Sequence, residues 1–176
     1  MRRLMLLRHA KTERAESGVR DRERKLMKRG RDDASTIGAY MAQHGLIPDL
    51  AVVSPAVRAQ QTWTFVAAML PEAPRMVTED RIYDANSETL ADVIAATRNA
   101  RSLIIVGHNP SLHDLALQLS ASGDGHARER VSENLPTSGL VVIEFPFDDW
   151  SLVRPRTGLL TRFVSPRLIA DTTNGA

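Results

Sequence analysis

Residues 4–12 read LMLLRHAKT, in which a short apolar run, Leu4–Leu7, ends at the polar pair Arg8 and His9. A run of this length without polar alternation is typical of a strand that is buried on both faces of a sheet. It is too short for the apolar part of a signal peptide, which needs about 7–15 residues followed by a small-residue cleavage site. We therefore interpret Leu4–Leu7 as the first strand and expect a cytoplasmic protein.

Two further apolar runs have the same form, since each ends in polar residues and leads into a helical pattern. Leu50–Val53 is followed by SPAVR (54–58), and Leu103–Val106 is followed by GHNP (107–110). Strands that alternate with amphipathic helices predict a three-layer α/β/α sandwich with a mostly parallel central sheet. The expected helices span Gly30–His44, Pro55–Leu70, a segment capped by Ser87, and Pro110–Ser120.

The other strand candidates are Arg75–Thr78 and three late segments, Leu140–Phe145, Ser151–Val153 and Leu159–Val164. Short turns separate the late segments, so we expect them to add an antiparallel edge to the sheet. The chain has 176 residues, no cysteine, and no apolar run near the roughly 20 residues that cross a bilayer. We expect one domain, residues 1–176, without disulfides or thiol catalysis.

The polar residues after the three buried strands belong together in such a fold. Parallel strands end at one edge of the sheet, and ligands bind in the crevice beyond that edge. Ser54 and Asn109 each precede a proline, so we expect them to cap helices that aim N–H groups at the same place. This pattern predicts a site for a dianion such as phosphate. Four side chains reach the edge, and none is a carboxylate: Arg8, His9, Arg58 and His108.

Chemistry at a phosphate site needs an attacking group. The chain has no cysteine, shows no serine–histidine pairing, and has carboxylates too scattered for a metal centre. A neutral histidine is a competent nucleophile near pH 7, and neighbouring guanidinium groups disfavour its protonation. We predict His9 as the nucleophile, because Arg8 precedes it at the strand end, and His108 as a donor to the phosphoryl oxygens. We expect no metal and no cofactor.

Three blocks carry a resemblance to a known family: LLRHAKT (6–12), SPAVRAQQT (54–62) and VGHNPSL (106–112). In this order and spacing they resemble the histidine phosphatase superfamily, which contains phosphoglycerate mutases and acid phosphatases. LPTSGL (135–140) is similar to its short phosphohistidine phosphatase branch, called the SixA type. The resemblance covers nearly the whole chain and implies a phosphoglycerate mutase-like fold. It also implies that His9 carries the phosphoryl group, in a pocket completed by Arg8, Arg58 and His108.

Other residues of these blocks are expected to bind substrate: Lys11, Thr12, Ser54 and Asn109. Lys11 is equally well explained as a solvated surface residue. Gln61 and Thr62 follow Arg58 by three and four residues on one helix face, where they would hold its guanidinium group. Structural packing explains Thr62 equally well. The general acid of the superfamily has no clear counterpart in EDRIYDANSETL (79–90). Three candidates stay open there, namely Asp80, Asp84 and Glu88.

The missing acid favours a substrate with a phosphorus–nitrogen bond, because a nitrogen leaving group departs more easily than an alkoxide. We predict a metal-independent phosphatase that removes phosphate from phosphohistidine on a protein of a phosphorelay or phosphotransfer system. The short chain leaves little material for a lid, and an open pocket suits a side chain on a protein surface. Two alternatives stay open: a small-molecule phosphomonoester phosphatase or mutase, and a phosphate-binding regulatory module without turnover.

The net charge is only +2, but basic residues concentrate between Arg20 and Arg31. This segment is either a solvated loop and helix start or a docking surface for an acidic or phosphorylated partner. It contains no aromatic residue on which bases would stack, so we do not expect nucleic-acid binding. We expect a phosphorylated protein as the partner, small phosphate esters as the alternative substrates, no membrane contact, and a monomer.

Overall fold

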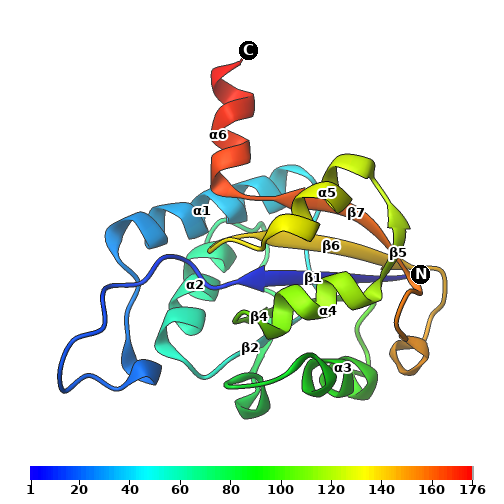
Figure 1. Ribbon diagram of the computed structural model, residues 1–176, viewed down its shortest axis with the longest axis horizontal. Coiled ribbons are helices and arrows are strands. Elements are labelled where there is room, and N and C mark those ends of the chain that lie inside the picture. The colour runs from blue at the N-terminus through cyan, green and yellow to red at the C-terminus, as the bar shows by residue number, and fades with distance from the viewer. Residues whose placement is uncertain (176) are drawn as a thin grey trace.

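The computed structural model describes residues 1–175, which form a seven-stranded sheet with helices on both faces (Figure 1). The order of the strands across the sheet is β3-β2-β4-β1-β6-β7-β5. β1 is therefore central, with β4 and β6 as its neighbours. The strands are β1 (Arg2–Arg8), β2 (Leu50–Val53), β3 (Arg75–Thr78), β4 (Ser102–Gly107), β5 (Ser120–Gly123), β6 (Leu140–Phe145) and β7 (Gly158–Val164).

Six α-helices and three short 3-10 helices accompany these strands in the described part of the chain, and the last helix, α6, follows β7. The α-helices are α1 (Lys28–Gln43), α2 (Val57–Ala67), α3 (Ser87–Ala96), α4 (Ser111–Leu119), α5 (Gly125–Glu133) and α6 (Pro166–Asn174). The 3-10 helices are η1 (Asp21–Glu23), η2 (Asp80–Ile82) and η3 (Trp150–Leu152). Within residues 1–175, no helix is both long enough and apolar enough to cross a bilayer.

The two faces of the sheet have separate hydrophobic cores. Leu4 and Leu6 of β1 pack with α3, α4 and α5, whereas Met5 and Leu7 pack with α1 and α2. All four side chains are fully buried. Burying a side chain of this size stabilises a fold by about 1.5–3 kcal/mol, so an apolar run without alternation belongs in the middle of a covered sheet. The predicted three-layer α/β/α sandwich is confirmed.

The directions of the strands agree only in part with the sequence prediction. β3, β2, β4 and β1 are mutually parallel, and β5 is parallel to β7. β6 runs antiparallel to both β1 and β7. The sheet is therefore mostly parallel, as predicted. The expected antiparallel edge is wrong, because the one reversed strand lies inside the sheet and β5 forms the edge beyond β7.

The predicted helix caps are also wrong. α2 begins at Val57 and α4 at Ser111, so neither Ser54 nor Asn109 caps a helix. The hydroxyl of Ser54 is instead engaged with a histidine, as described below. α3 is capped by Asn86, not by Ser87. The side chain of Asn86 accepts a hydrogen bond from the N–H of Thr89 in the first turn.

Some elements near the C-terminus differ from the prediction as well. Ser151–Val153 is not a strand, because Asp149 accepts a hydrogen bond from the N–H of Ser151 and starts η3. β5, α5 and α6 were not predicted. α5 buries only Ala127 and Val131, and α6 has no fully buried residue and stands away from the sheet in Figure 1. α5 is mostly polar, so the sequence gives little hydrophobic periodicity to mark it.

Candidate active site

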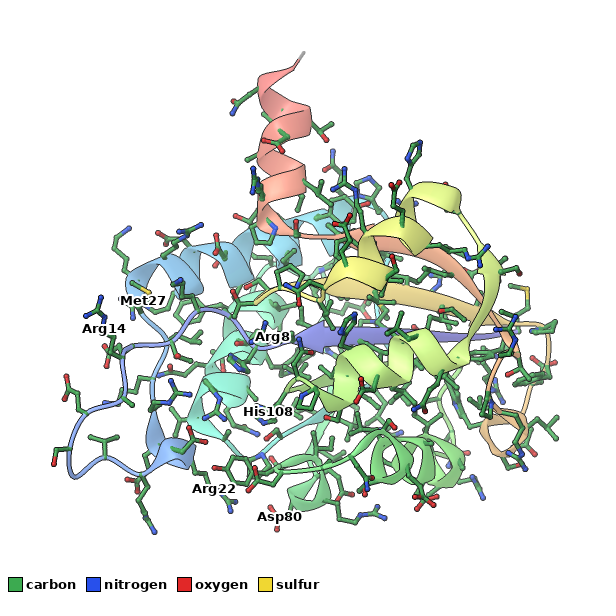
Figure 2. The ribbon with its side chains drawn as sticks, in the orientation of Figure 1. Arg8, Arg14, Arg22, Met27, Asp80 and His108 are labelled. Carbon is green, nitrogen blue, oxygen red and sulfur yellow. The ribbon has the colours of Figure 1, made fainter. Side chains whose placement is uncertain are left out.

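The carboxyl ends of β1 and β4 bring the predicted residues together at one edge of the sheet. The parallel register pairs Arg8 with Gly107, and the N–H of His9 donates to the carbonyl of Gly107 at 3.0 Å. The ring centroids of His9 and His108 are 5.4 Å apart. Figure 2 shows Arg8 and His108 at this edge, beyond the end of β1. The predicted convergence of strand ends is therefore confirmed.

His9 is almost completely buried and has a fixed ring orientation. Its Nδ1 lies 2.8 Å from the carbonyl oxygen of Ala10, which only accepts, so Nδ1 carries the proton and Nε2 keeps its lone pair. Burial lowers the pKa of His9 to about 3, against the opposing effect of the Ala10 carbonyl, and charges at His108, Arg58 and Arg8 lower it further. The ring is therefore neutral at pH 7, chiefly because it is buried and only secondarily because guanidinium groups are near.

His108 faces His9 from the end of β4. Its Nε2 lies 2.7 Å from Oγ of Ser54, and its Nδ1 is buried without a hydrogen-bond partner among the described residues. Burial, followed by the charge of Arg58, lowers the pKa of His108 to about 4. This imidazole is also neutral at pH 7, with one nitrogen engaged and the other free to bond a ligand.

Two guanidinium groups complete the cluster. Arg58 lies in the first turn of α2 and is 6% exposed. Arg8 donates from Nη1 to the carbonyl of Leu135 at 3.1 Å, and the amide of Asn109 donates to the same carbonyl at 2.8 Å. Nε of both arginines is buried, and neither has a partner within residues 1–175. Buried donors are normally paired, so these two suit an anionic ligand.

Asp21 is the pocket residue that sequence reasoning missed. Its carbonyl accepts from Nη1 of Arg58 at 2.8 Å, and its Oδ2 accepts from Nη2 of Arg58 at 3.1 Å and from the hydroxyl of Tyr83 at 2.8 Å. The Tyr83 hydroxyl first, and Arg58 and Arg24 after it, hold the pKa of Asp21 below its usual range despite partial burial. In the sequence, Asp21 is one of several acidic residues scattered through the basic segment between Arg20 and Arg31, and no motif marks it.

Tyr83 connects this carboxylate to the histidines. Its ring meets the ring of His108 edge-on, with 5.8 Å between centroids, and the guanidinium carbon of Arg58 lies 6.0 Å from its centroid. On its outer side, Arg22 lies 5.6 Å from the same ring and pairs with Asp80 at 3.6 Å. Figure 2 shows Arg22 and Asp80 near each other at the periphery of the molecule, farther out than His108. Tyr83 therefore forms a wall between the pocket and the molecular surface.

Of the four predicted substrate-binding residues, Ser54 contacts His108, and Asn109 shares the carbonyl of Leu135 with Arg8. Lys11 and Thr12 have no hydrogen bond to the four central side chains. The hydroxyl of Thr12 accepts from Arg24 at 3.1 Å, and Lys11 is exposed while its carbonyl accepts from the N–H of Met27 at 3.0 Å. These two residues anchor the segment that carries η1.

The expected supports of Arg58 act elsewhere. Thr62 donates to the backbone carbonyl of Arg58 at 2.6 Å and accepts from the N–H of Ala10 at 2.9 Å, and Gln61 accepts from the N–H of Leu26 at 2.8 Å. Neither side chain has a hydrogen bond to the guanidinium group, so that role is wrong for both, and the buried Thr62 has the alternative packing role instead. Both side chains instead tie α2 to the segment that follows β1, because one helical turn brings them toward that segment and away from the end of Arg58.

The three candidate acids of residues 79–90 lie outside the pocket. Asp80 pairs with Arg22, and its side chain is 84% exposed. Asp84 and Glu88 are exposed, and in the described chain neither has a hydrogen bond or ion pair to the arginine–histidine cluster. Asp21 is the one carboxylate among residues 1–175 that contacts this cluster.

Residues 4–90 match the model of the histidine phosphatase superfamily, branch 1. An uncharacterized protein of Mycobacterium tuberculosis strain H37Rv is 34% identical over 164 residues, which cover 92% of this chain and 100% of that relative. The chain belongs to the histidine phosphatase superfamily.

Solved structures narrow this assignment within the histidine phosphatase superfamily. A crystal structure assigned as the phosphohistidine phosphatase SixA of Agrobacterium tumefaciens is 31% identical, with a TM-score of 0.77 and coverage of 94% of this chain and 98% of that one. SixA in complex with tungstate has the same fold, with a TM-score of 0.75 at 18% identity over 95% of this chain and 99% of that one. The protein is thus a histidine phosphatase of the SixA type with the phosphoglycerate mutase-like fold, and this assignment supports phosphatase activity.

Proposed function

We propose that this protein removes phosphate from phosphohistidine on another protein and that His9 carries the phosphoryl group between two half-reactions. One observation carries the proposal: His9 is held neutral, with Nδ1–H fixed on the Ala10 carbonyl and the Nε2 lone pair free. Nε2 attacks phosphorus, and the cationic ring that results is stabilised through Nδ1–H by the same carbonyl.

The other pocket residues divide the work of binding and charge stabilisation. The unpaired Nε–H groups of Arg8 and Arg58 bind the equatorial phosphoryl oxygens, whose charge must be neutralised in the transition state. Nδ1 of His108 donates a third hydrogen bond. Ser54 orients His108, and Asn109 helps to fix the carbonyl that orients Arg8.

We prefer a substrate with a phosphorus–nitrogen bond to an ester because of the positions and ionisation of the carboxylates. The carboxylates at positions 80, 84 and 88 lie outside the pocket, and the one at position 21 is ionised at neutral pH. An alkoxide leaving group needs a proton that no contacting residue supplies, whereas an imidazole departs without one. The similarity to a phosphohistidine phosphatase SixA agrees with this substrate.

The test compares the wild type with His9→Ala, without added metal, on three substrates. These are a phosphohistidine-bearing carrier protein, an aryl phosphate and a sugar phosphate. We expect rapid loss of phosphohistidine with the wild type only, and slow ester hydrolysis. Faster turnover of the sugar phosphate would reassign the protein as a small-molecule phosphatase. Absence of His9-dependent turnover on all three would indicate a phosphate-binding module.

A further inference from the structure

We propose that Asp21 makes the pocket selective for a protonated imidazole leaving group, by accepting a hydrogen bond from the ring nitrogen that does not carry phosphorus. The inference rests on the proposed function and deepens it, since it assigns the preference for a phosphorus–nitrogen bond to one carboxylate. Asp21 lies on η1, and no sequence block assigned it a role in the site.

The position of Asp21 fits a contact with the leaving group. Its side chain is 55% exposed, so it borders solvent at the mouth of the pocket, whereas Arg58 behind it is 7% exposed at its side chain. The leaving group departs toward solvent, because His9 attacks from the buried side and phosphoryl transfer is in line. Tyr83 lies between Asp21 and His108. Its hydroxyl donates to Asp21, and its ring meets the ring of His108 edge-on.

The carboxylate has room for one more hydrogen bond. Oδ2 accepts from Arg58 and Tyr83, and Oδ1 accepts from Nε of Arg24 at 3.2 Å. Nη2 of Arg24 also lies 3.1 Å from Oδ1 as an ion pair, without the geometry of a hydrogen bond. An ionised carboxylate offers about four acceptor positions, so one position remains. Its backbone carbonyl holds Nη1 of Arg58 independently of the side chain.

The bonds and charges of the first half-reaction balance without an acid from the enzyme. A phosphoimidazolium carries a proton on its distal nitrogen, and this N–H donates to Asp21. Nε2 of His9 forms a bond to phosphorus while the phosphorus–nitrogen bond breaks, and the electron pair of that bond goes to the departing nitrogen. The leaving group is then a neutral imidazole that retains its distal proton, and His9 becomes a phosphoimidazolium.

In the second half-reaction, water attacks the phosphorus atom of phosphorylated His9. The electron pair of the phosphorus–nitrogen bond returns to Nε2, and both protons of the water leave with the dihydrogen phosphate ion.

Asp21 opposes an alkoxide leaving group in the first half-reaction, because an ionised carboxylate has no proton to give and repels the developing negative charge. The same residue therefore favours one substrate class and disfavours the other.

The test is Asp21→Asn, which removes the charge but keeps the shape and the backbone carbonyl. The substrates are a peptide phosphorylated on its single histidine and p-nitrophenyl phosphate. We expect kcat/KM for the phosphopeptide to fall about tenfold, the typical loss of one charge-assisted hydrogen bond. Turnover of p-nitrophenyl phosphate should fall clearly less than turnover of the phosphopeptide, because nitrophenolate needs no protonated partner and any loss there reflects only the contact of Asp21 with Arg58.

The pH dependence separates this role from a purely structural one. The groups that contact Asp21 are Arg24, Arg58 and Tyr83, and the hydrogen bond to Asp21 raises the pKa of Tyr83 above its usual value. His9 and His108 stay neutral between about pH 5.5 and about pH 8. We expect the deficit of Asp21→Asn to grow toward about pH 8 and shrink toward about pH 5.5, where the phosphohistidine is protonated without help.

Asp80→Asn is the matched control, because it removes a nearby carboxylate that has no contact with the pocket. It should leave both rates unchanged. Equal losses on both substrates with Asp21→Asn, a deficit independent of pH, or no loss would each overturn the inference. If the wild type hydrolyses p-nitrophenyl phosphate through His9 but does not dephosphorylate the phosphopeptide, the proposed function itself is wrong, and the inference fails with it.

Discussion

The hydroxyl of Ser54, at the end of β2, lies 2.7 Å from Nε2 of His108, at the end of β4. Oγ of Ser54 also accepts from the N–H of Ala56 at 3.3 Å, so its own hydrogen is free to donate to the imidazole. A ring that accepts at Nε2 carries its proton on Nδ1. Ser54 therefore sets the tautomer in which His108 presents a donor from the nitrogen that has no protein partner.

Replacing Ser54 with Ala should lower kcat by about tenfold while KM changes little, because a misoriented donor weakens the transition state more than the bound substrate. The 15N chemical shifts of the His108 ring should move from the single Nδ1–H tautomer toward a mixture. A His108 ring that keeps its tautomer in Ser54→Ala would show that the hydroxyl does not set it.

The planar set of N–H donors in the Arg58 guanidinium group should matter more for catalysis than its positive charge. Arg58→Lys keeps the positive charge but loses the buried Nε–H and the two contacts to Asp21. We expect kcat/KM to fall about 100-fold, the usual effect of removing one donor to developing charge. Arg128→Lys, on the exposed surface of α5, is the control and should behave as wild type. A similar activity in both variants would remove Arg58 from the phosphate site.

Acid should destabilise the folded protein through its two histidines. The pKa values of His9 and His108 are lowered from 6.5 to about 3 and about 4. Below pH 6.5 these two imidazoles therefore bind protons in the unfolded chain but stay neutral in the folded protein. The free energy of unfolding is therefore expected to fall as the pH drops from 6.5 toward 4. Urea unfolding of the wild type and of His9→Gln at several pH values checks this, and the variant should show the shallower decline. Parallel curves would contradict it.

Gly30 in α1 should tolerate no side chain. A Cβ there would lie 2.1 Å from the carbonyl oxygen of Lys11, which accepts from Met27. Gly30→Ala should lower the free energy of unfolding by about 1–3 kcal/mol and displace the segment after His9. Gly125→Ala is the comparison, since nothing lies within 4 Å of its Cβ position and its φ is not in the left-handed region. Denaturant unfolding of both variants decides, and equal stabilities would refute the close approach.

The sequence predicts the parallel part of this fold and the centre of the site for the same reason. Runs such as Leu4–Leu7 and Leu103–Val106 are apolar on both faces, so their strands must be covered, and parallel neighbours must end at one edge. His9 and His108 therefore meet whatever the loops do. β5 (Ser120–Gly123) carries no comparable signal, because it contains no large apolar residue.

The contacts around Asp21 and Tyr83 join residues far apart in the sequence, so no helical or strand periodicity predicts them. Asp21, on the short helix η1, reaches Arg58 across 37 residues, and Tyr83 reaches Asp21 across 62. Neither contact is encoded by spacing, so composition alone made Asp21 one charge among many. Ser54 was assigned to a helix cap because Pro55 follows it, and the preference for a histidine across the sheet edge was not visible in the chain.

The reversal of β6 has a further consequence for the charge of the pocket. Because this strand runs opposite to β1, its amino end lies at the active-site edge, where Gly139 accepts from the N–H of Arg8 at 3.1 Å. The loop before it supplies the carbonyl of Leu135, to which the Arg8 side chain donates. A neutral acceptor therefore orients this guanidinium group. Arg8 keeps its full positive charge for the phosphate, where an aligning carboxylate would have cancelled much of it.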